Sequence, residues 1–383
     1  MLDLNKIPEA VRYEGGVSRR LFVAYASALA ALPSLASRAT AAERSRSFTS
    51  DPFSLGVASG DPTPRSVVLW TKLAPQPKDP DGGMPAEIVA VDWEIAEDDQ
   101  MQKVVAKGTQ PATPQLGHTV HVTARGLKPD RWYWYRFRTG DAESPIGRTR
   151  TMPAAHATPQ QLDFAFASCQ HYETGLFTAY EHMAADDLDL VFHLGDYIYE
   201  YPGEDGRVRK HTGPSNTKLK TLADYRERHM QYRADPLLHN MHARCPWFVT
   251  WDDHEFDNNY AAVIQEEKGD GTDPVSFLTQ RAAAYQAYYE MMPLSARCLP
   301  RGPEMKLYRS ANFGNLAEFF VLDTRQYRTD QPNGDGLSLL NEDALCDTNS
   351  LLGRKQRRWL DSGLITSTAT WNVLAQQVMM GMV

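Results

Sequence analysis

The chain has 383 residues, of which 42% are hydrophobic and 10% aromatic, so it can bury a substantial core and is long enough for two domains. Its formal net charge of -8 argues against a general binder of nucleic acid or anionic membranes, because no basic field would attract polyanions. Four cysteines at wide, irregular spacing suit neither a zinc ribbon nor a dense disulfide scaffold: Cys169, Cys245, Cys298 and Cys346.

The N-terminal segment has the pattern of an export signal. Paired arginines, Arg19 and Arg20, directly precede an uncharged run rich in alanine and leucine at residues 21–37, and small residues follow around Ala41. This resembles a twin-arginine signal. We therefore predict a signal peptide over residues 1–42, read by the twin-arginine export machinery, and a periplasmic or secreted protein with no stable membrane span after cleavage. A membrane anchor or an amphipathic first helix is the alternative, although either would favour a more apolar run or a helical charge pattern.

The next hundred residues alternate apolar and polar side chains in the manner of β-strands, most clearly at 67–70, 89–95 and 120–122. Helical periodicity is nearly absent. A Gly-Leu-Lys-Pro sequence at 126–129 precedes Tyr133 at a spacing similar to the tyrosine corner of immunoglobulin-type and fibronectin-type sandwiches. We predict a small all-β sandwich domain over residues 43–152, with aromatic side chains that fill its core and nothing that points to catalysis.

After a linker at 153–161, rich in alanine, proline and threonine, strands alternate with helices. The pattern predicts an α/β domain over residues 162–383. Its expected strands are at 162–168, 188–194, 247–251, 316–322 and 371–374, the first two of them buried, and its expected helices are at 225–244, 277–292 and 354–364. Catalytic residues in such sheets lie just beyond the carboxyl ends of strands, so we expect the functional residues of this domain at those positions.

Three of these strand ends carry side chains that bind metals. The candidates are Cys169, Asp196, Tyr199, Asp253 and His254. A carboxylate can bridge two cations, a tyrosinate or cysteinate is a strong donor to ferric iron, and further carboxylates suit calcium. Alone, Cys169 would more often be a core thiol, Asp196 a turn residue, and the acidic run at 252–255 a solvated cluster that opens a helix. Their occurrence together at three strand ends favours a metal site.

These residues resemble those of the alkaline phosphatase D family of the metallophosphatase superfamily. Two further segments share the resemblance: Phe-Ser-Leu-Gly-Val-Ala-Ser-Gly-Asp-Pro at 53–62 and Asp-Thr-Arg-Gln-Tyr-Arg at 323–328. The resemblance extends along the chain from the signal to Val383. It implies that the α/β domain is a metallophosphatase-type layered β-sheet core with flanking helices. It also implies a pair of cofactor ions, Fe³⁺ and Ca²⁺.

The resemblance assigns roles to individual residues. Cys169 stands where other metallophosphatases carry an aspartate and histidine pair, Asp196 is the bridging carboxylate, and Tyr199 is an iron-binding phenolate. Asp253 corresponds to a metal ligand, and His254 to a partner of the phosphate or the leaving group. The implied reaction is hydrolysis of phosphomonoesters, phosphodiesters or both by a metal-bound hydroxide that attacks in line. The sequence does not identify the physiological phosphate ester.

Arg325 follows the strand at 316–322 and could clamp a phosphate or form a structural ion pair. Cys298 and Cys346 could pair after export. The remaining histidines of the α/β domain form no recognisable metal-binding pair, and His193, within a buried strand, is expected to be a core residue.

The resemblance also implies late aspartate and histidine ligands, yet all eleven histidines lie at or before His254. We therefore expect a site that is not completed before Val383. The alternative functions are a weakly active or inactive fragment, and a module that only binds phosphate.

Overall fold

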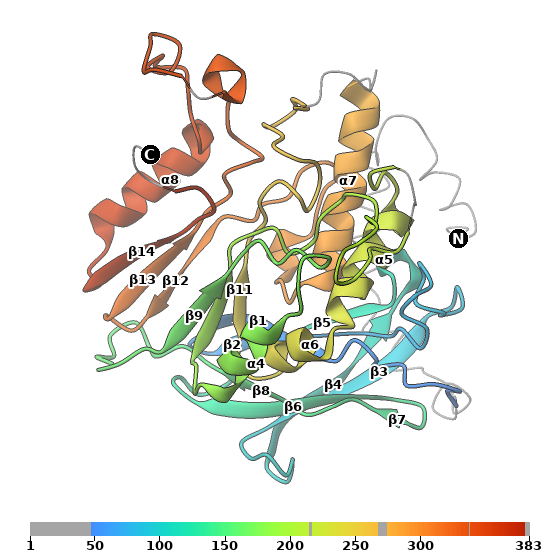
Figure 1. Ribbon diagram of the computed structural model, residues 1–383. Helices are drawn as coiled ribbons and strands as arrows, with labels where there is room; N and C mark the ends of the chain where they lie inside the picture. Colours follow the sequence, from blue (N-terminus) through green and yellow to red (C-terminus); the bar gives the residue numbers. More distant parts are fainter. Residues whose placement is uncertain (1–46, 214–216, 267–273, 337, 380–383) are drawn as a thin grey trace, which may run out of the picture.

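The first third of the structure is β-sheet, as its alternating apolar residues predict. The computed structural model describes residues 47–213, 217–266, 274–336 and 338–379, so the predicted signal at 1–42 lies outside it (Figure 1). The strands in this part are β1 (Val57–Thr63), β2 (Ser66–Lys72), β3 (Val89–Ala96), β4 (Val104–Ala112), β5 (Thr119–Arg125), β6 (Trp132–Thr139), β7 (Ala142–Glu143) and β8 (Gly147–Arg150).

These strands form two sheets that pack face to face. One sheet contains β1, β2 and β5, and the other has the order β4-β3-β6-β7, with β8 also pairing with β6. Their facing side chains share one core, which includes Val57, Leu69, Val122, Val91, Ile95 and Phe137. The tyrosine-corner contact is present, because the backbone N–H of Lys128 donates to the hydroxyl of Tyr133 at 2.9 Å. The predicted sandwich is therefore confirmed as an arrangement of strands.

The remainder of the chain alternates strands with helices. Its strands are β9 (Phe164–Ala167), β10 (Leu190–His193), β11 (Trp247–Val249), β12 (Arg309–Phe313), β13 (Ala317–Val321) and β14 (Trp371–Ala375). Its helices are α4 (Thr178–Ala185), α5 (Leu222–Arg233), α6 (Pro236–His242), α7 (Pro274–Met291) and α8 (Gly353–Thr366), with short 3-10 turns at Ala296–Cys298 and Pro332–Asp335. The mixed α/β character of this region agrees with the prediction.

A single sheet crosses the predicted domain boundary. Its strand order is β5-β2-β1-β11-β10-β9, so the sandwich sheet continues into the α/β region through parallel pairing of β1 with β11 at Gly60 and Trp247. A Cβ atom at Gly60 would lie 2.4 Å from the carbonyl oxygen of Pro293, so only glycine fits here. The linker at 153–161 thus separates two sequence patterns but not two independent sheets.

The second sheet of the α/β region has the order β12-β13-β14 and packs against β10 and β11. Phe192 stacks on Phe248 at 5.4 Å between ring centroids and contacts Phe319 of the second sheet at 4.7 Å. On the outer side of this sheet, α8 packs through Leu360 against Phe320 (Figure 1). The finer assignment of a metallophosphatase-type layered core stays a prediction.

The single helix predicted at 225–244 is wrong, because two helices occupy this segment. Pro236 is the first residue of α6, and Asp235 before it is extended and accepts hydrogen bonds from the N–H groups of Leu237 and Leu238. Proline cannot supply the N–H that a continuous helix needs, and it disfavours a helical conformation in the preceding residue. The chain therefore ends α5 at Arg233 and caps a new helix.

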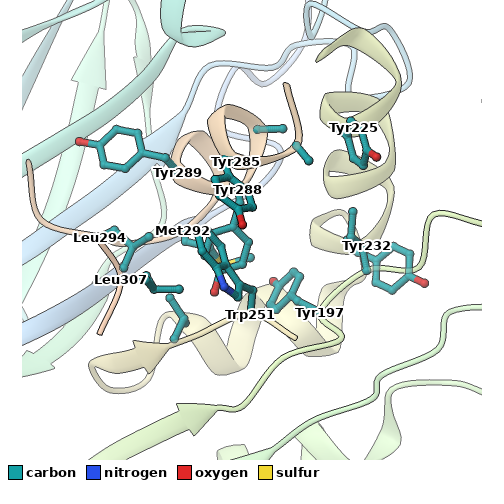
Figure 2. Packing of buried hydrophobic residues seen from close by; sticks show 14 of the residues in the cluster. Tyr197, Tyr225, Tyr232, Trp251, Tyr285, Tyr288, Tyr289, Met292, Leu294 and Leu307 are labelled. Carbon is teal, nitrogen blue, oxygen red and sulfur yellow. The ribbon is translucent and has the colours of Figure 1, made fainter. Parts of the chain in front are cut away.

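The helices bury an aromatic cluster beneath the strand ends that carry the candidate ligands. Trp251, which directly precedes the acidic run, stacks on Tyr285 of α7 with ring centroids 4.1 Å apart and an interplanar angle of 18°. Figure 2 shows Tyr285 and Tyr288 on α7 directed at Trp251, with Tyr197 beside it. This packing anchors the segments that follow β10 and β11.

The prediction of a buried strand at 162–168 is wrong in one respect. The strand β9 forms, but Phe166 is 69% exposed, because β9 is the last strand in its sheet and has a neighbour on one side within the described chain.

Cys298 and Cys346 do not pair, since both thiols are free, one buried and the other exposed. Among the described helices, none has both the length and the apolar character needed to cross a membrane.

Candidate metal centre

The carboxyl ends of β9, β10 and β11 meet at one edge of the sheet. These strands are parallel, and Ala167, His193 and Val249 align in one row. The chain then leaves the sheet at three adjacent points and carries Cys169, Asp196 and Asp253 only two to four residues further on. Parallel pairing therefore explains how ligands far apart in the sequence come together.

Two of the predicted ligands lie in tight turns with left-handed backbone. Cys169 has φ 55° and Asp196 has φ 54°, and the N–H of Cys169 donates to the carbonyl oxygen of Gly195 at 3.1 Å. A Cβ atom at Gly195 would lie 2.4 Å from the backbone nitrogen of Asp252, so the glycine lets the second and third turns touch. Positive φ in non-glycine residues is uncommon and is concentrated at functional sites.

Asp196, Asp253 and His254 form the centre of the site. Each offers one ligand atom, and these atoms all lie within 4.8 Å of one another. The Oδ2 atom of Asp196 accepts a hydrogen bond from the Tyr199 hydroxyl at 3.0 Å, whereas its Oδ1 atom is buried and has no partner. Burial and the nearby charge of Asp253 raise the pKa of Asp196. A buried carboxylate oxygen without a partner is the arrangement expected of a metal ligand.

Tyr199 and Cys169 both face Asp196. Burial and the charge of Asp196 raise the pKa of the Cys169 thiol to about 11. The same two causes raise the pKa of Tyr199 far above its usual value. Both groups would become anionic ligands only if a cation offset these effects, so metal binding would release protons.

Arg325 holds the acidic run in place. Its Nε donates to Asp252 Oδ1 at 2.5 Å, its Nη1 to Asn259 Oδ1 at 2.9 Å, and its Nη2 lies 3.3 Å from Asp253 Oδ1. These contacts are those of a structural ion pair. The sequence allowed two roles for Arg325, this one and a phosphate clamp. Asp253 also accepts from the Asn259 N–H at 2.6 Å, so its side chain is fixed on two sides.

His254 is oriented by a carboxylate that the sequence did not single out. Its Nδ1 lies 2.8 Å from Glu200 Oε2, and its Nε2 lies 3.9 Å from Asp253 Oδ2, so the Nε2 side faces the proposed ligands. Burial opposes the imidazolium, but the hydrogen bond and charge of Glu200, with the charges of Asp253 and Asp196, raise the pKa of His254 to about 9. In the metal-free protein the ring is therefore protonated near neutral pH and can donate a proton.

Glu255 joins two of the ligand turns. Its carboxylate accepts hydrogen bonds from the N–H of Tyr197 at 2.5 Å and from the N–H of Asp252 at 2.8 Å. Glu255 and Glu200 were missed as individual residues because their partners lie in other turns, 58 and 54 positions away in the sequence. The only signal in the sequence for these two glutamates is that Glu200 directly follows Tyr199 and Glu255 directly follows His254.

The charge balance of the site suits cations. Its carboxylates outnumber its cationic side chains. The carboxylates are those of Asp196, Asp252, Asp253, Glu200 and Glu255, and the cationic side chains are those of Arg325, His254 and Lys218. Buried negative charge that lacks a partner is costly, and hard cations bound by carboxylate oxygens would offset it. The thiol, phenol and carboxylate donors fit a site with one ferric ion and one calcium ion.

The comparisons with known proteins agree with this geometry. Residues 164–383 match the sequence model described as PhoD-like phosphatase, and residues 37–153 match the one described as PhoD-like phosphatase, N-terminal domain. Alkaline phosphatase D of Bacillus subtilis (strain 168) is 55% identical over 336 residues, which is 86% of this chain and 56% of that protein. A solved structure of PhoD superimposes with a TM-score of 0.84 and 54% identity, covering 87% of this chain and 64% of the other. The chain thus spans little more than half the length of this curated relative.

Proposed function

Because the chain belongs to the PhoD-like phosphatase family, we propose that it is part of a metal-dependent enzyme that hydrolyses phosphate esters at the centre around Asp196. One observation carries the proposal. The buried Oδ1 atom of Asp196 has no partner in a cluster where Asp253 and His254 lie within 4.8 Å. Such an atom needs a cation or an ordered water, and the surplus of carboxylates favours the cation.

The proposed ligands divide by chemistry. Cys169 and Tyr199, once deprotonated, would serve a ferric ion, Asp196 would bridge, and Asp253 would serve calcium. Two such ions, when bound, supply charge that stabilises a phosphoryl group and acidify a water that can attack it. The chain itself supplies the positions of these donors, fixed by Glu255 and Arg325.

His254 would act on the leaving group. Its Nε2 faces the cluster, and Glu200 at Nδ1 stabilises the protonated ring, so a proton is held ready at Nε2. When the bond between phosphorus and the ester oxygen breaks, the alcohol part of the substrate leaves as an alkoxide, which needs that proton. His254 is therefore proposed as the general acid, and Glu200 as the residue that positions it.

The test is hydrolysis by the metal-loaded protein of nitrophenyl phosphate, a monoester, and bis-nitrophenyl phosphate, a diester, with metal content measured on the same samples. We expect turnover of one or both. His254→Gln should lower turnover of an alkyl phosphate, whose alkoxide leaving group needs a proton, about 100-fold or more with metal content unchanged, as followed by release of inorganic phosphate. Nitrophenolate leaves without a proton, so turnover of the two nitrophenyl esters should fall less. His156→Gln, at an exposed position, is the matched control. Absence of turnover in a protein that holds both metals would contradict the proposal. Full activity of His254→Gln on the alkyl phosphate would contradict the role of His254 as general acid and leave the rest of the proposal intact.

We also propose that the protein is exported by the twin-arginine route to the periplasm or the cell exterior. Arg19 and Arg20 before the uncharged run at 21–37 support it. Replacement of both arginines by lysine should retain the protein in the cytoplasm, as measured by fractionation. Unchanged export would contradict this route.

A further inference from the structure

Arg328 lies in the turn that follows β13, three residues beyond Arg325, whose guanidinium contacts Asp252 and Asp253. The turn is rigid, because Asp323 Oδ1 accepts hydrogen bonds from the N–H groups of Arg325 and Gln326 at 3.0 and 2.9 Å. On the far side of Arg328, the N–H of Thr329 donates to the carbonyl oxygen of Ser350 at 2.9 Å. The backbone that carries Arg328 is therefore fixed on both sides.

The other cationic side chains around the centre already have anionic partners. Arg325 is engaged by Asp252, Asp253 and Asn259 through three of its nitrogens. Lys218 lies 3.3 Å from Asp257 and 3.7 Å from Glu200. The charge of each is therefore already offset by carboxylates.

Arg328 differs from both. Within the described part of the chain its side chain forms no hydrogen bond or ion pair, and its Nε atom is buried without a partner. Burial, followed by the like charge of Arg325, lowers the pKa of Arg328, and the carboxylates of Asp252, Asp335 and Asp253 offset this only in part. The charges of Asp252 and Asp253 therefore act on the Arg328 guanidinium.

We infer that Arg328, rather than Arg325, binds the nonbridging oxygens of the substrate's phosphoryl group, an assignment that rests on the proposed function. A buried guanidinium N–H without a partner is costly, and a planar guanidinium matches two phosphate oxygens in a bidentate fork. A phosphoryl group at the centre would give Arg328 the anion that the protein does not provide. Arg328 would thus orient the phosphoryl group toward His254 and the metal ligands.

The experiment measures binding of inorganic phosphate to the metal-loaded full chain by titration calorimetry, beside metal content and the melting temperature. Arg328→Gln removes the fork and the charge, Arg328→Lys keeps the charge alone, and Arg354→Gln replaces an exposed arginine of α8 as the control. We expect Arg328→Gln to weaken phosphate binding about 10- to 100-fold, Arg328→Lys to weaken it less, and the control to leave it unchanged. Metal content should be equal in all four proteins.

The outcomes separate this inference from the proposed function. If the wild-type chain hydrolyses nitrophenyl phosphate and Arg328→Gln binds phosphate as tightly as wild type, the role of Arg328 is wrong and the function stands. If wild type binds phosphate through Arg328 but hydrolyses neither ester, the inference stands and the function is wrong. If Arg328→Gln and Arg328→Lys both lose phosphate binding and also lose metal, Arg328 has a structural role and the inference is overturned. Failure of the wild-type protein to bind phosphate would also overturn the inference.

Discussion

Replacement of His229 by leucine should change how stability depends on pH, because this histidine is buried in the folded protein without a hydrogen-bond partner at either ring nitrogen. Burial, with the nearby charges of Arg228 and Arg233, lowers the pKa of His229 to about 3, against 6.5 in the unfolded chain. Between these two values the unfolded state binds one more proton than the folded state. Stability contributed by the neutral ring is therefore present above pH 6.5 and is lost as the pH falls below it.

The magnitude follows from the two pKa values. At 1.36 kcal/mol per pH unit, the proton taken up at His229 on unfolding removes about 2 kcal/mol of stability between pH 6.5 and pH 5, and about 5 kcal/mol if the fold survived to pH 3. Leucine binds no proton. The plot of unfolding free energy against pH should therefore be shallower in His229→Leu by the slope of one proton, whatever the replacement does to stability at neutral pH.

The assay is urea unfolding of metal-free protein at several pH values from 7.5 to 5. His156 is exposed to water in the folded protein, so His156→Leu should leave the slope as in wild type. Parallel curves for wild type and His229→Leu would refute the reasoning, because they would mean that His229 is already protonated in the folded state or stays neutral in both.

Three further predictions concern the metal centre. Glu255→Gln should weaken metal binding about 10- to 100-fold and lower the free energy of unfolding by about 1–3 kcal/mol, because an amide cannot accept both backbone N–H groups. Calorimetry and urea unfolding would test this, and unchanged metal affinity would contradict it. Glu200→Gln should lower turnover about 10- to 100-fold at constant metal content, since the amide lacks the charge that stabilises protonated His254; equal turnover would count against the dyad. Tyr199→Phe should shift or abolish a visible charge-transfer band of the iron-loaded protein, and an unchanged spectrum would exclude Tyr199 as an iron ligand.

The strands, and the edge of the sheet at which the candidate ligands meet, could be predicted from the sequence because their signals are local. Buried strands show as apolar runs, and the residues just beyond their ends include Cys169, Asp196 and Asp253. Parallel pairing of β9, β10 and β11 then brings these residues to one edge. The strand ends indicated the segments, and the resemblance to the alkaline phosphatase D family assigned the roles of the residues within them.

What the sequence did not reveal depends on contacts between distant segments. The break at Pro236 had a local signal in the proline itself, which begins α6. The exposure of β9 depends on its place at the edge of the sheet, and the pairing of β1 with β11 joins residues far apart in the chain. The pairing of Arg325 with Asp252 likewise required the folded chain, and so did the lack of a partner for Arg328 Nε among the described residues.

The central claim is that Asp196 holds two cations at once, and metal analysis of Asp196→Asn tests it most directly. Wild type, loaded with ferric iron and calcium and passed through a desalting column, should retain both ions, as should Asp361→Asn on exposed α8. Asp196→Asn should lose both together, because one carboxylate serves both. Retention of either ion at the wild-type level by Asp196→Asn, or absence of both from wild type, would contradict the account.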